Sequence, residues 1–181
     1  THLYRSQWFN ERFKVYYLWY LSNFRSIREI SLSFMSLVNQ IDQTDPDFRG
    51  KPFVIIGHSM GGLVARSYMM ERGPSGLGGN RVLRLITLGT PHHGSPLVNG
   101  EARNKKGNPF DRLLFRALDS RLFIIPWDKE NRTDLRWDNY DALLDYETYR
   151  VERNDWLVRL NSSNTFQERI LVYGGTVTPL T

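Results

Sequence analysis

The central motif of this chain is Phe53-Val54-Ile55-Ile56-Gly57-His58-Ser59-Met60-Gly61-Gly62, an apolar run that leads into a glycine-rich turn. The apolar run is typical of a strand, and the residues after the turn follow a helical pattern. A serine at such a junction takes a strained backbone conformation, and the glycines at positions 57 and 61 permit the close approach of the neighbouring backbone. The pattern therefore predicts that Ser59 is a nucleophile presented above the edge of a sheet.

The neighbours of Ser59 extend this interpretation. A helix that begins near Met60 directs its first backbone N–H groups, and the positive end of its dipole, towards a developing oxyanion. The Met60 N–H is therefore the expected oxyanion donor, and Gly57, His58 and Gly61 are expected to form the elbow that carries the serine. The alternative is a glycine-rich turn that has this shape without any chemistry.

Upstream of the motif, strand and helix patterns follow one another. Residues 13–20 have the aromatic and β-branched bias of a buried strand. Ser26 and Glu29 have the spacing of a capping box, and apolar residues recur at helical intervals from there to position 41. We therefore expect a strand followed by an amphipathic helix.

Downstream, the same alternation continues. The helix after the elbow should end near Gly73-Pro74, where proline cannot extend the helix. Further strands are expected at Val82–Leu88 and Ile170–Tyr173. The order predicts an α/β fold with a mostly parallel sheet flanked by helices, in which reactive groups gather at the carboxyl ends of the strands.

The segment between the last two strands is too long for a simple crossover and predicts a helical cap or lid. We expect a core over residues 1–94, the cap over 95–167 and a return to the core over 168–181. Within the cap, one helix is expected after Asn108-Pro109, and a second short helix includes Trp156, Leu157 and Leu160. The apolar and aromatic content of the cap would suit a site for acyl chains, but ordinary packing of the cap on the sheet is the favoured interpretation for most of these residues.

Composition restricts the possible partners and chemistry. The 181 residues are 40% hydrophobic and carry a formal charge of +5, but no basic run suggests a nucleic-acid partner. The mild positive charge would also suit contact with an anionic lipid surface. The absence of cysteine excludes thiol catalysis and cysteine-ligated zinc, and no apolar stretch reaches the length of a membrane span. The compartment stays open, with a secreted, periplasmic or membrane-peripheral location favoured.

Two separated motifs occur in a familiar order: VIIGHSMGGLVAR at residues 54–66 and LITLGTPHHGS at residues 85–95. Together they resemble the lipase and esterase branch of the α/β-hydrolases. The resemblance implies a carboxylic-ester hydrolase that acts on acyl or lipid esters without a cofactor. In the family mechanism, Ser59 is acylated by the substrate and then freed by water, while a histidine passes the protons and an acid holds that histidine.

The chain departs from the family pattern at both ends. Members carry an upstream His-Gly oxyanion loop, whereas His2 is followed by Leu3. The acid and histidine of the triad follow the strand that corresponds to Ile170–Tyr173, yet the sequence ends at Thr181 without either. We therefore expect that the chain lacks the N- and C-terminal parts of the fold, and that the triad histidine and acid lie outside it.

The four histidines and the acids of the chain offer no clear substitute. His2 and His58 are poorly placed to act as a base, and His92 or His93 could approach Ser59 from the end of the third strand. The resemblance instead makes the His92-His93 loop structural. The acids Asp111, Asp128, Asp134, Asp138, Asp141, Asp145 and Asp155 are interpreted as surface charges, helix caps and salt-bridge partners. No metal site is expected, because the adjacent histidines point in different directions and no i, i+4 histidine pair exists.

Three functional hypotheses remain at this stage. The first is a serine esterase or lipase. The second is an acyltransferase or thioesterase of the same superfamily, which would use the same acyl-enzyme with a different acceptor or leaving group. The third is a non-catalytic member whose cap binds a lipid or protein partner. The oligomeric state and the acyl-chain length stay open.

Overall fold

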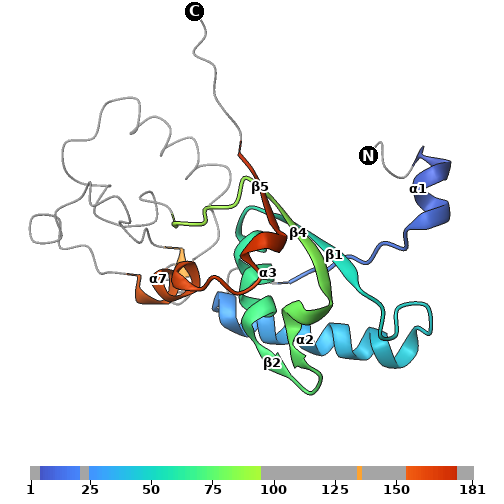
Figure 1. The fold of residues 1–181 in the computed structure, drawn as a ribbon, viewed down its shortest axis with the longest axis horizontal. Helices are drawn as coiled ribbons and strands as arrows, with labels where there is room; N and C mark the ends of the chain where they lie inside the picture. Colours follow the sequence, from blue (N-terminus) through green and yellow to red (C-terminus); the bar gives the residue numbers. More distant parts are fainter. Residues whose placement is uncertain (1–4, 21–24, 95–133, 136–153, 175–181) are drawn as a thin grey trace, which may run out of the picture.

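The structure, a computed structural model, describes residues 5–20, 25–94, 134–135 and 154–174. Its centre is a parallel sheet of three strands in the order β1-β4-β5, formed by β1 (Phe53–His58), β4 (Val82–Leu88) and β5 (Ile170–Tyr173) (Figure 1). Ile55 lies opposite Leu85, which in turn lies opposite Ile170. The predicted parallel sheet and its three strands are confirmed.

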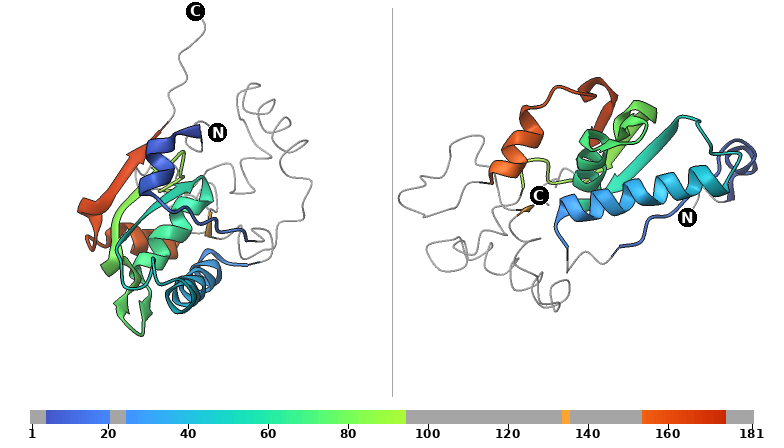
Figure 2. Two further views of the ribbon diagram at one scale, coloured as in Figure 1. Left: turned by 90° about the vertical axis from the view of Figure 1, so that its right-hand side faces the viewer. Right: turned by 90° about the horizontal axis from the view of Figure 1, so that it is seen from below.

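Two helices pack on this sheet. α3 (Met60–Met70) follows β1 and packs on β1 and β4, and α2 (Ile27–Thr44) packs against α3 (Figure 2). Side chains on the other face of the sheet are open, since Ile56 is 60% exposed and Tyr173 is 58% exposed. The apolar run of β1 predicts that both faces of the sheet are covered. Within the described residues, one face is covered, by α3 with α2 behind it.

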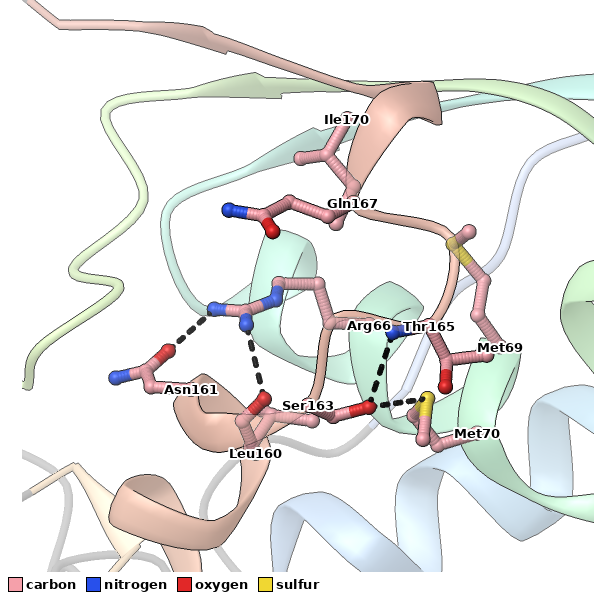
Figure 3. A pocket seen from close by; sticks show the side chains of 9 residues that line it. All are labelled: Arg66, Met69, Met70, Leu160, Asn161, Ser163, Thr165, Gln167 and Ile170. Atoms are coloured by element: carbon pink, nitrogen blue, oxygen red, sulfur yellow. Dashed lines mark hydrogen bonds between the residues drawn. The ribbon is translucent and has the colours of Figure 1, made fainter.

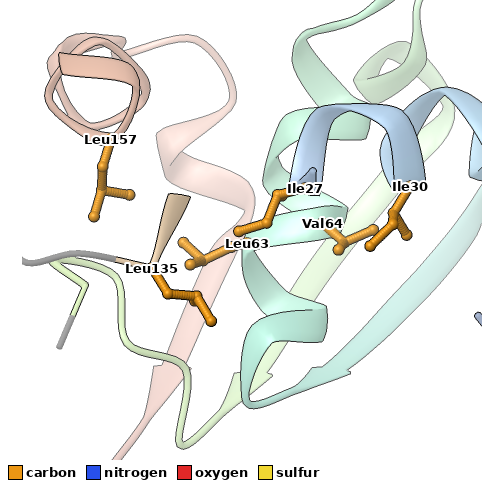
Figure 4. Close-up of a cluster of buried hydrophobic side chains, with 6 residues drawn as sticks. All are labelled: Ile27, Ile30, Leu63, Val64, Leu135 and Leu157. Atoms are coloured by element: carbon orange, nitrogen blue, oxygen red, sulfur yellow. The ribbon is translucent and has the colours of Figure 1, made fainter. Parts of the chain in front are cut away.

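The core consists of two clusters on the helical side of the sheet. One joins α2 and α3 to α7 (Asp155–Ser162), and its buried members are Ile27, Ile30, Leu63, Val64, Leu135 and Leu157 (Figure 4). The other joins α2, α3 and β4 through Val38, Ala65, Tyr68, Met69, Val82 and Leu85. The short helix expected around Trp156, Leu157 and Leu160 is confirmed as α7, and Leu157 packs in the first cluster.

The start of α2 is held by two side-chain caps. Ser26 and Glu29 form the predicted capping box: the Ser26 hydroxyl accepts from the Glu29 N–H at 3.2 Å, and the Glu29 carboxylate accepts from the Ser26 N–H at 2.9 Å. The Asp134 carboxylate accepts from the Ile27 N–H at 2.7 Å. Asp134 is therefore a helix cap, as expected, and it ties residues 134–135 to the beginning of α2.

The prediction of a strand over residues 13–20 is wrong. The segment has no regular secondary structure, because none of the described strands pairs with it, and Trp19 is 89% exposed. Side chains hold it instead: Lys14 and Tyr16 both donate to the Asp45 carboxylate at the end of α2. The Lys14 hydrogen bond, followed by that of Tyr16, lowers the pKa of Asp45 to about 2.

Several boundaries also differ from the sequence-based expectation. A short helix, α1 (Gln7–Arg12), begins at an N-cap on Ser6 and was not expected. α3 ends at Met70 rather than near Gly73-Pro74, because the hairpin of β2 (Arg72–Gly73) and β3 (Gly76–Leu77) starts there. Short 3₁₀ turns at Gly78–Arg81 and Gln167–Arg169 precede β4 and β5.

Most of the expected cap falls outside the described residues, including the helix after Asn108-Pro109 and the aromatic tract up to position 149. The division of the chain at 94/95 and 167/168 therefore stays a prediction. Among the helices that are described, none has both the length and the apolar character needed to cross a bilayer.

Replacing Ser26 with alanine should lower the free energy of unfolding by about 1 kcal/mol, because the Glu29 N–H loses its acceptor. Ser36→Ala is the matched control, since Ser36 is an exposed serine within the same helix and should change stability by less than about 0.5 kcal/mol. Urea unfolding of both variants measures the difference. Equal midpoints for the two variants would contradict the role of the cap.

Candidate active site

Ser59 lies at the junction of β1 and α3 in a conformation that is unusual for any residue but glycine. Its φ is 53° and its ψ is −131°. A non-glycine residue in this region carries a strain of about 1–3 kcal/mol and persists only where its surroundings hold it. The side chain of Ser59 is exposed and does not cap α3. The predicted elbow is therefore present, with a hydroxyl that the helix does not use.

The backbone of Ser59 is held from both sides. Its N–H donates to the Leu88 carbonyl oxygen at 2.9 Å. Its own carbonyl oxygen accepts from the Gly62 N–H at 3.1 Å and from the Thr90 hydroxyl at 2.9 Å. Leu88 and Thr90 flank the end of β4, so the neighbouring strand fixes the strained residue.

The close approach that makes the turn possible occurs at Gly57 and Gly62. A Cβ on Gly57 would lie 2.7 Å from the Gly62 Cα, and a Cβ on Gly62 would lie 2.1 Å from the Thr90 Oγ1. Gly61 differs from its predicted role, because a Cβ there would meet only the Tyr20 hydroxyl at 3.5 Å, an ordinary contact. The second tight position of the elbow is therefore Gly62 rather than Gly61, since Gly62 faces the threonine side chain.

Met60 and His58 flank Ser59. Met60 is the first residue of α3, so its N–H belongs to the unsatisfied first turn of the helix, as the oxyanion role requires. His58 is the last residue of β1, and its side chain is exposed on the alternate face from the buried Gly57. The oxyanion role of Met60 and the place of His58 in the elbow stay predictions.

His92 is engaged through both ring nitrogens. Its Nδ1 lies 3.1 Å from Nη1 of Arg66, and its Nε2 lies 2.9 Å from the Thr87 hydroxyl. Arginine can only donate, so Nδ1 accepts and Nε2 carries the proton that it donates to Thr87. Burial, and then the charge of Arg66, lowers the pKa of His92 to about 4. These contacts favour the structural interpretation of His92 over a role as the base for Ser59.

Arg66 links this histidine to α7. Its guanidinium donates to the Asn161 side-chain oxygen at 2.7 Å and to the Leu160 carbonyl oxygen at 3.2 Å, and burial lowers its pKa (Figure 3). Asn161 in turn donates to the His92 carbonyl oxygen at 2.8 Å. The network joins the elbow helix, the loop after β4 and the helix that follows the insertion.

A shallow hollow lies beside this network, between α3 and the segment that connects α7 to β5 (Figure 3). Its lining combines the Arg66 guanidinium with thioether, aliphatic, hydroxyl and amide side chains. The lining residues are Arg66, Met69, Met70, Leu160, Asn161, Ser163, Thr165, Gln167 and Ile170. Arg66, Thr87, Thr90 and Asn161 were not expected from the sequence to be functional. Arg66, Thr87 and Thr90 stand within the two family motifs, which was the signal available for them, whereas Asn161 lies outside both.

The described residues leave the other triad positions unassigned. His93 is exposed at the end of the same loop, and Asp155 lies in the first turn of α7. The remaining candidate acids, apart from Asp134, fall outside the described residues. Within the part of the chain that is described, no three histidine or acidic side chains gather as metal ligands would.

The engaged histidine predicts a dependence of stability on pH. The pKa of His92 in the folded protein, about 4, is below that of an unfolded histidine at 6.5, so the unfolded state binds more protons between these values. The contribution of His92 to the free energy of unfolding should be fully present above pH 6.5 and should be lost progressively as the pH drops to 4. In His92→Gln, which cannot titrate, urea midpoints should fall less over this range. Parallel profiles for the two proteins would show that His92 does not titrate this way.

The glycine contacts predict opposite results for two neighbouring substitutions. Gly57→Ala should destabilise the protein by about 1–3 kcal/mol, because the new Cβ meets backbone that cannot retreat. Gly61→Ala should be neutral or stabilising by up to about 1 kcal/mol, since it replaces a helical glycine at which a new Cβ makes only an ordinary contact, 3.5 Å from the Tyr20 hydroxyl. Thermal unfolding of both variants gives the comparison. A Gly61→Ala variant less stable than Gly57→Ala would refute this geometry.

Comparison with known proteins identifies the family and the fold of the chain. The family described as PGAP1-like alpha/beta domain matches residues 6–112. Phospholipase PlaB from Legionella pneumophila is similar in structure, with 19% identity, a TM-score of 0.53 and coverage of 88% of this chain and 29% of that chain. The mature lipase BlEst2 from Bacillus licheniformis has 20% identity and a TM-score of 0.44, over 74% of this chain and 45% of that chain.

No curated protein matches the chain. The chain spans less than half the length of the two solved structures named above. The PGAP1-like match, by contrast, covers more than half of this chain and includes the elbow and the loop after β4. The chain therefore belongs to the PGAP1-like alpha/beta family, and it shares its α/β-hydrolase fold with the structure of phospholipase PlaB.

Proposed function

We propose that this chain carries the nucleophile of a serine ester hydrolase that acts on acyl or lipid esters. The observation that supports the proposal most strongly is the strained conformation of Ser59, which has a φ of 53° although it is not a glycine. Strain of this kind is concentrated at sites where it orients a reacting group. A turn with a purely structural role could avoid this backbone strain with a glycine at position 59.

In the proposed mechanism, the Ser59 Oγ attacks the carbonyl carbon of the ester, and its proton passes to a base. The tetrahedral oxyanion accepts a hydrogen bond from the Met60 N–H, whose position at the start of α3 also adds the positive end of the helix dipole. Collapse of this intermediate expels the alcohol, which takes the proton, and leaves an acyl-enzyme. Water then attacks the acyl carbon and releases the carboxylic acid and the free serine.

The base and the acid of the triad are proposed to lie outside the described residues. His92 is unsuited to the role, because its Nδ1 accepts from Arg66 and its Nε2 donates to Thr87. The low pKa of His92, near 4, also makes it a weak base. The loop that carries His92 is then structural and takes no direct part in the reaction, as the resemblance implies.

A substrate with an acyl chain is proposed on two grounds. The motifs at residues 54–66 and 85–95 resemble those of lipases and esterases. In addition, a structure with the same fold is that of a phospholipase. An acyltransferase or thioesterase would share the acyl-enzyme and differ in the acceptor or the leaving group.

Ser59→Ala should abolish ester hydrolysis, with a loss in kcat of about 10³-fold or more, because it removes the nucleophilic oxygen. The assay uses the full-length protein that contains this chain and p-nitrophenyl esters of short and long acyl chains. Ser36→Ala, an exposed serine on α2, is the control and should keep full activity.

A serine-reactive fluorophosphonate provides a second readout. Peptide mapping should locate the adduct on Ser59 in the wild type and in Ser36→Ala, and find none in Ser59→Ala. Wild-type turnover by Ser59→Ala would rule out the serine mechanism. Turnover that appears only with an alcohol or amine acceptor, and depends on Ser59, would favour the acyltransferase.

A further inference from the structure

The carbonyl group of Ser59 and the N–H of Met60 belong to one peptide unit. This unit is planar and trans, so the C=O and the N–H point in opposite directions and turn together. Whatever fixes the Ser59 carbonyl therefore also fixes the direction of the expected oxyanion donor. Two groups make this contact: the Gly62 N–H at 3.1 Å and the Thr90 hydroxyl at 2.9 Å.

The two contacts have different origins. The Gly62 N–H is part of the first turn of α3, so it moves with the helix and cannot orient the helix relative to the sheet. Thr90 belongs to the loop that follows β4, where the Leu88 carbonyl already holds the Ser59 N–H at 2.9 Å. Of the two, the Thr90 contact is the one that ties the Ser59–Met60 peptide to the sheet.

The surroundings of Thr90 are built to fit its side chain. A Cβ on Gly62 would lie 2.1 Å from the Thr90 Oγ1 and 2.7 Å from its Cγ2, so this side chain occupies the space that only glycine leaves open. Gly89, just before Thr90, has a φ of 56°, which turns the loop back after β4. The hydroxyl therefore reaches the Ser59 carbonyl from a tightly packed position.

We propose that Thr90 is a positioning residue for ester hydrolysis, which it serves by holding the Ser59–Met60 peptide so that the Met60 N–H points at the oxyanion. This inference rests on the proposed function. The hydrogen bond from Thr90 also draws electron density towards the Ser59 oxygen, which makes the Met60 N–H a better donor. Both effects act on the transition state, where the negative charge is fully developed, and little on the bound ester.

The test compares Thr90→Ala with Thr90→Ser in the full-length protein, because serine and alanine differ at this position only by the hydroxyl. In Thr90→Ala, kcat should fall about tenfold and KM should change less than twofold, as expected for a contact that matters in the transition state. Thr90→Ser should retain kcat within about twofold of the wild type. A trifluoromethyl ketone, which forms an oxyanion adduct with serine, should bind Thr90→Ala weaker by the same factor as the loss in kcat.

Three results would overturn the positioning role: wild-type kcat in Thr90→Ala, equal losses in Thr90→Ala and Thr90→Ser, or a loss confined to KM. Thermal unfolding of each variant ensures that the assays are made on folded protein. If Thr90→Ala does not fold, Thr90→Cys takes its place with the same readouts, since a thiol of similar size donates only weakly. Ser59→Ala separates the two proposals, because activity in that variant refutes the hydrolase mechanism, whereas an inactive Ser59→Ala with an unaffected Thr90→Ala refutes the positioning role alone.

Discussion

The strained backbone of Ser59 exists because the end of β4 holds it. The Leu88 carbonyl accepts from the Ser59 N–H, and the Thr90 hydroxyl donates to the Ser59 carbonyl. β4 is the central strand of the three and pairs with β1 and β5 in parallel. The conformation of the proposed nucleophile is thus anchored to the central strand of the described sheet.

The loop after β4 has a second task at His92. There the histidine ring bridges the Thr87 hydroxyl and the Arg66 guanidinium, which extends to Asn161 on α7. A partly buried arginine is costly unless its donors find acceptors, and here neutral acceptors from two elements provide them. The elbow helix, the central strand and α7 are therefore joined by polar contacts, some through His92 in the loop after β4 and others directly from Arg66 to α7.

The sequence predicted the parallel sheet, the elbow and the capping box because each has a local signature: an apolar run, a glycine-rich turn and the Ser26–Glu29 spacing. It failed at residues 13–20, where strand composition is not enough without a neighbouring strand to supply hydrogen bonds. The sequence also assigned the second tight contact of the elbow to Gly61. The structure places this contact between Gly62 and Thr90, which lies 28 positions after Gly62 in the chain. The Arg66–His92–Asn161 network depends in the same way on residues that only the fold brings together.

The contacts that hold Ser59 in position are separate from the base that the proposed mechanism needs to remove its proton. Among the described residues, the hydrogen bonds that hold the Ser59 backbone and the tight contacts of Gly57 and Gly62 join residues 57–90, and α3 packs on the same part of the sheet. The base must instead reach the exposed hydroxyl from the solvent side, and the histidine nearest in sequence to Thr90 is already committed to Arg66 and Thr87. A histidine fixed in two hydrogen bonds can stabilise the loop that holds Ser59, but it could accept the serine proton only by giving up the contacts that position this loop.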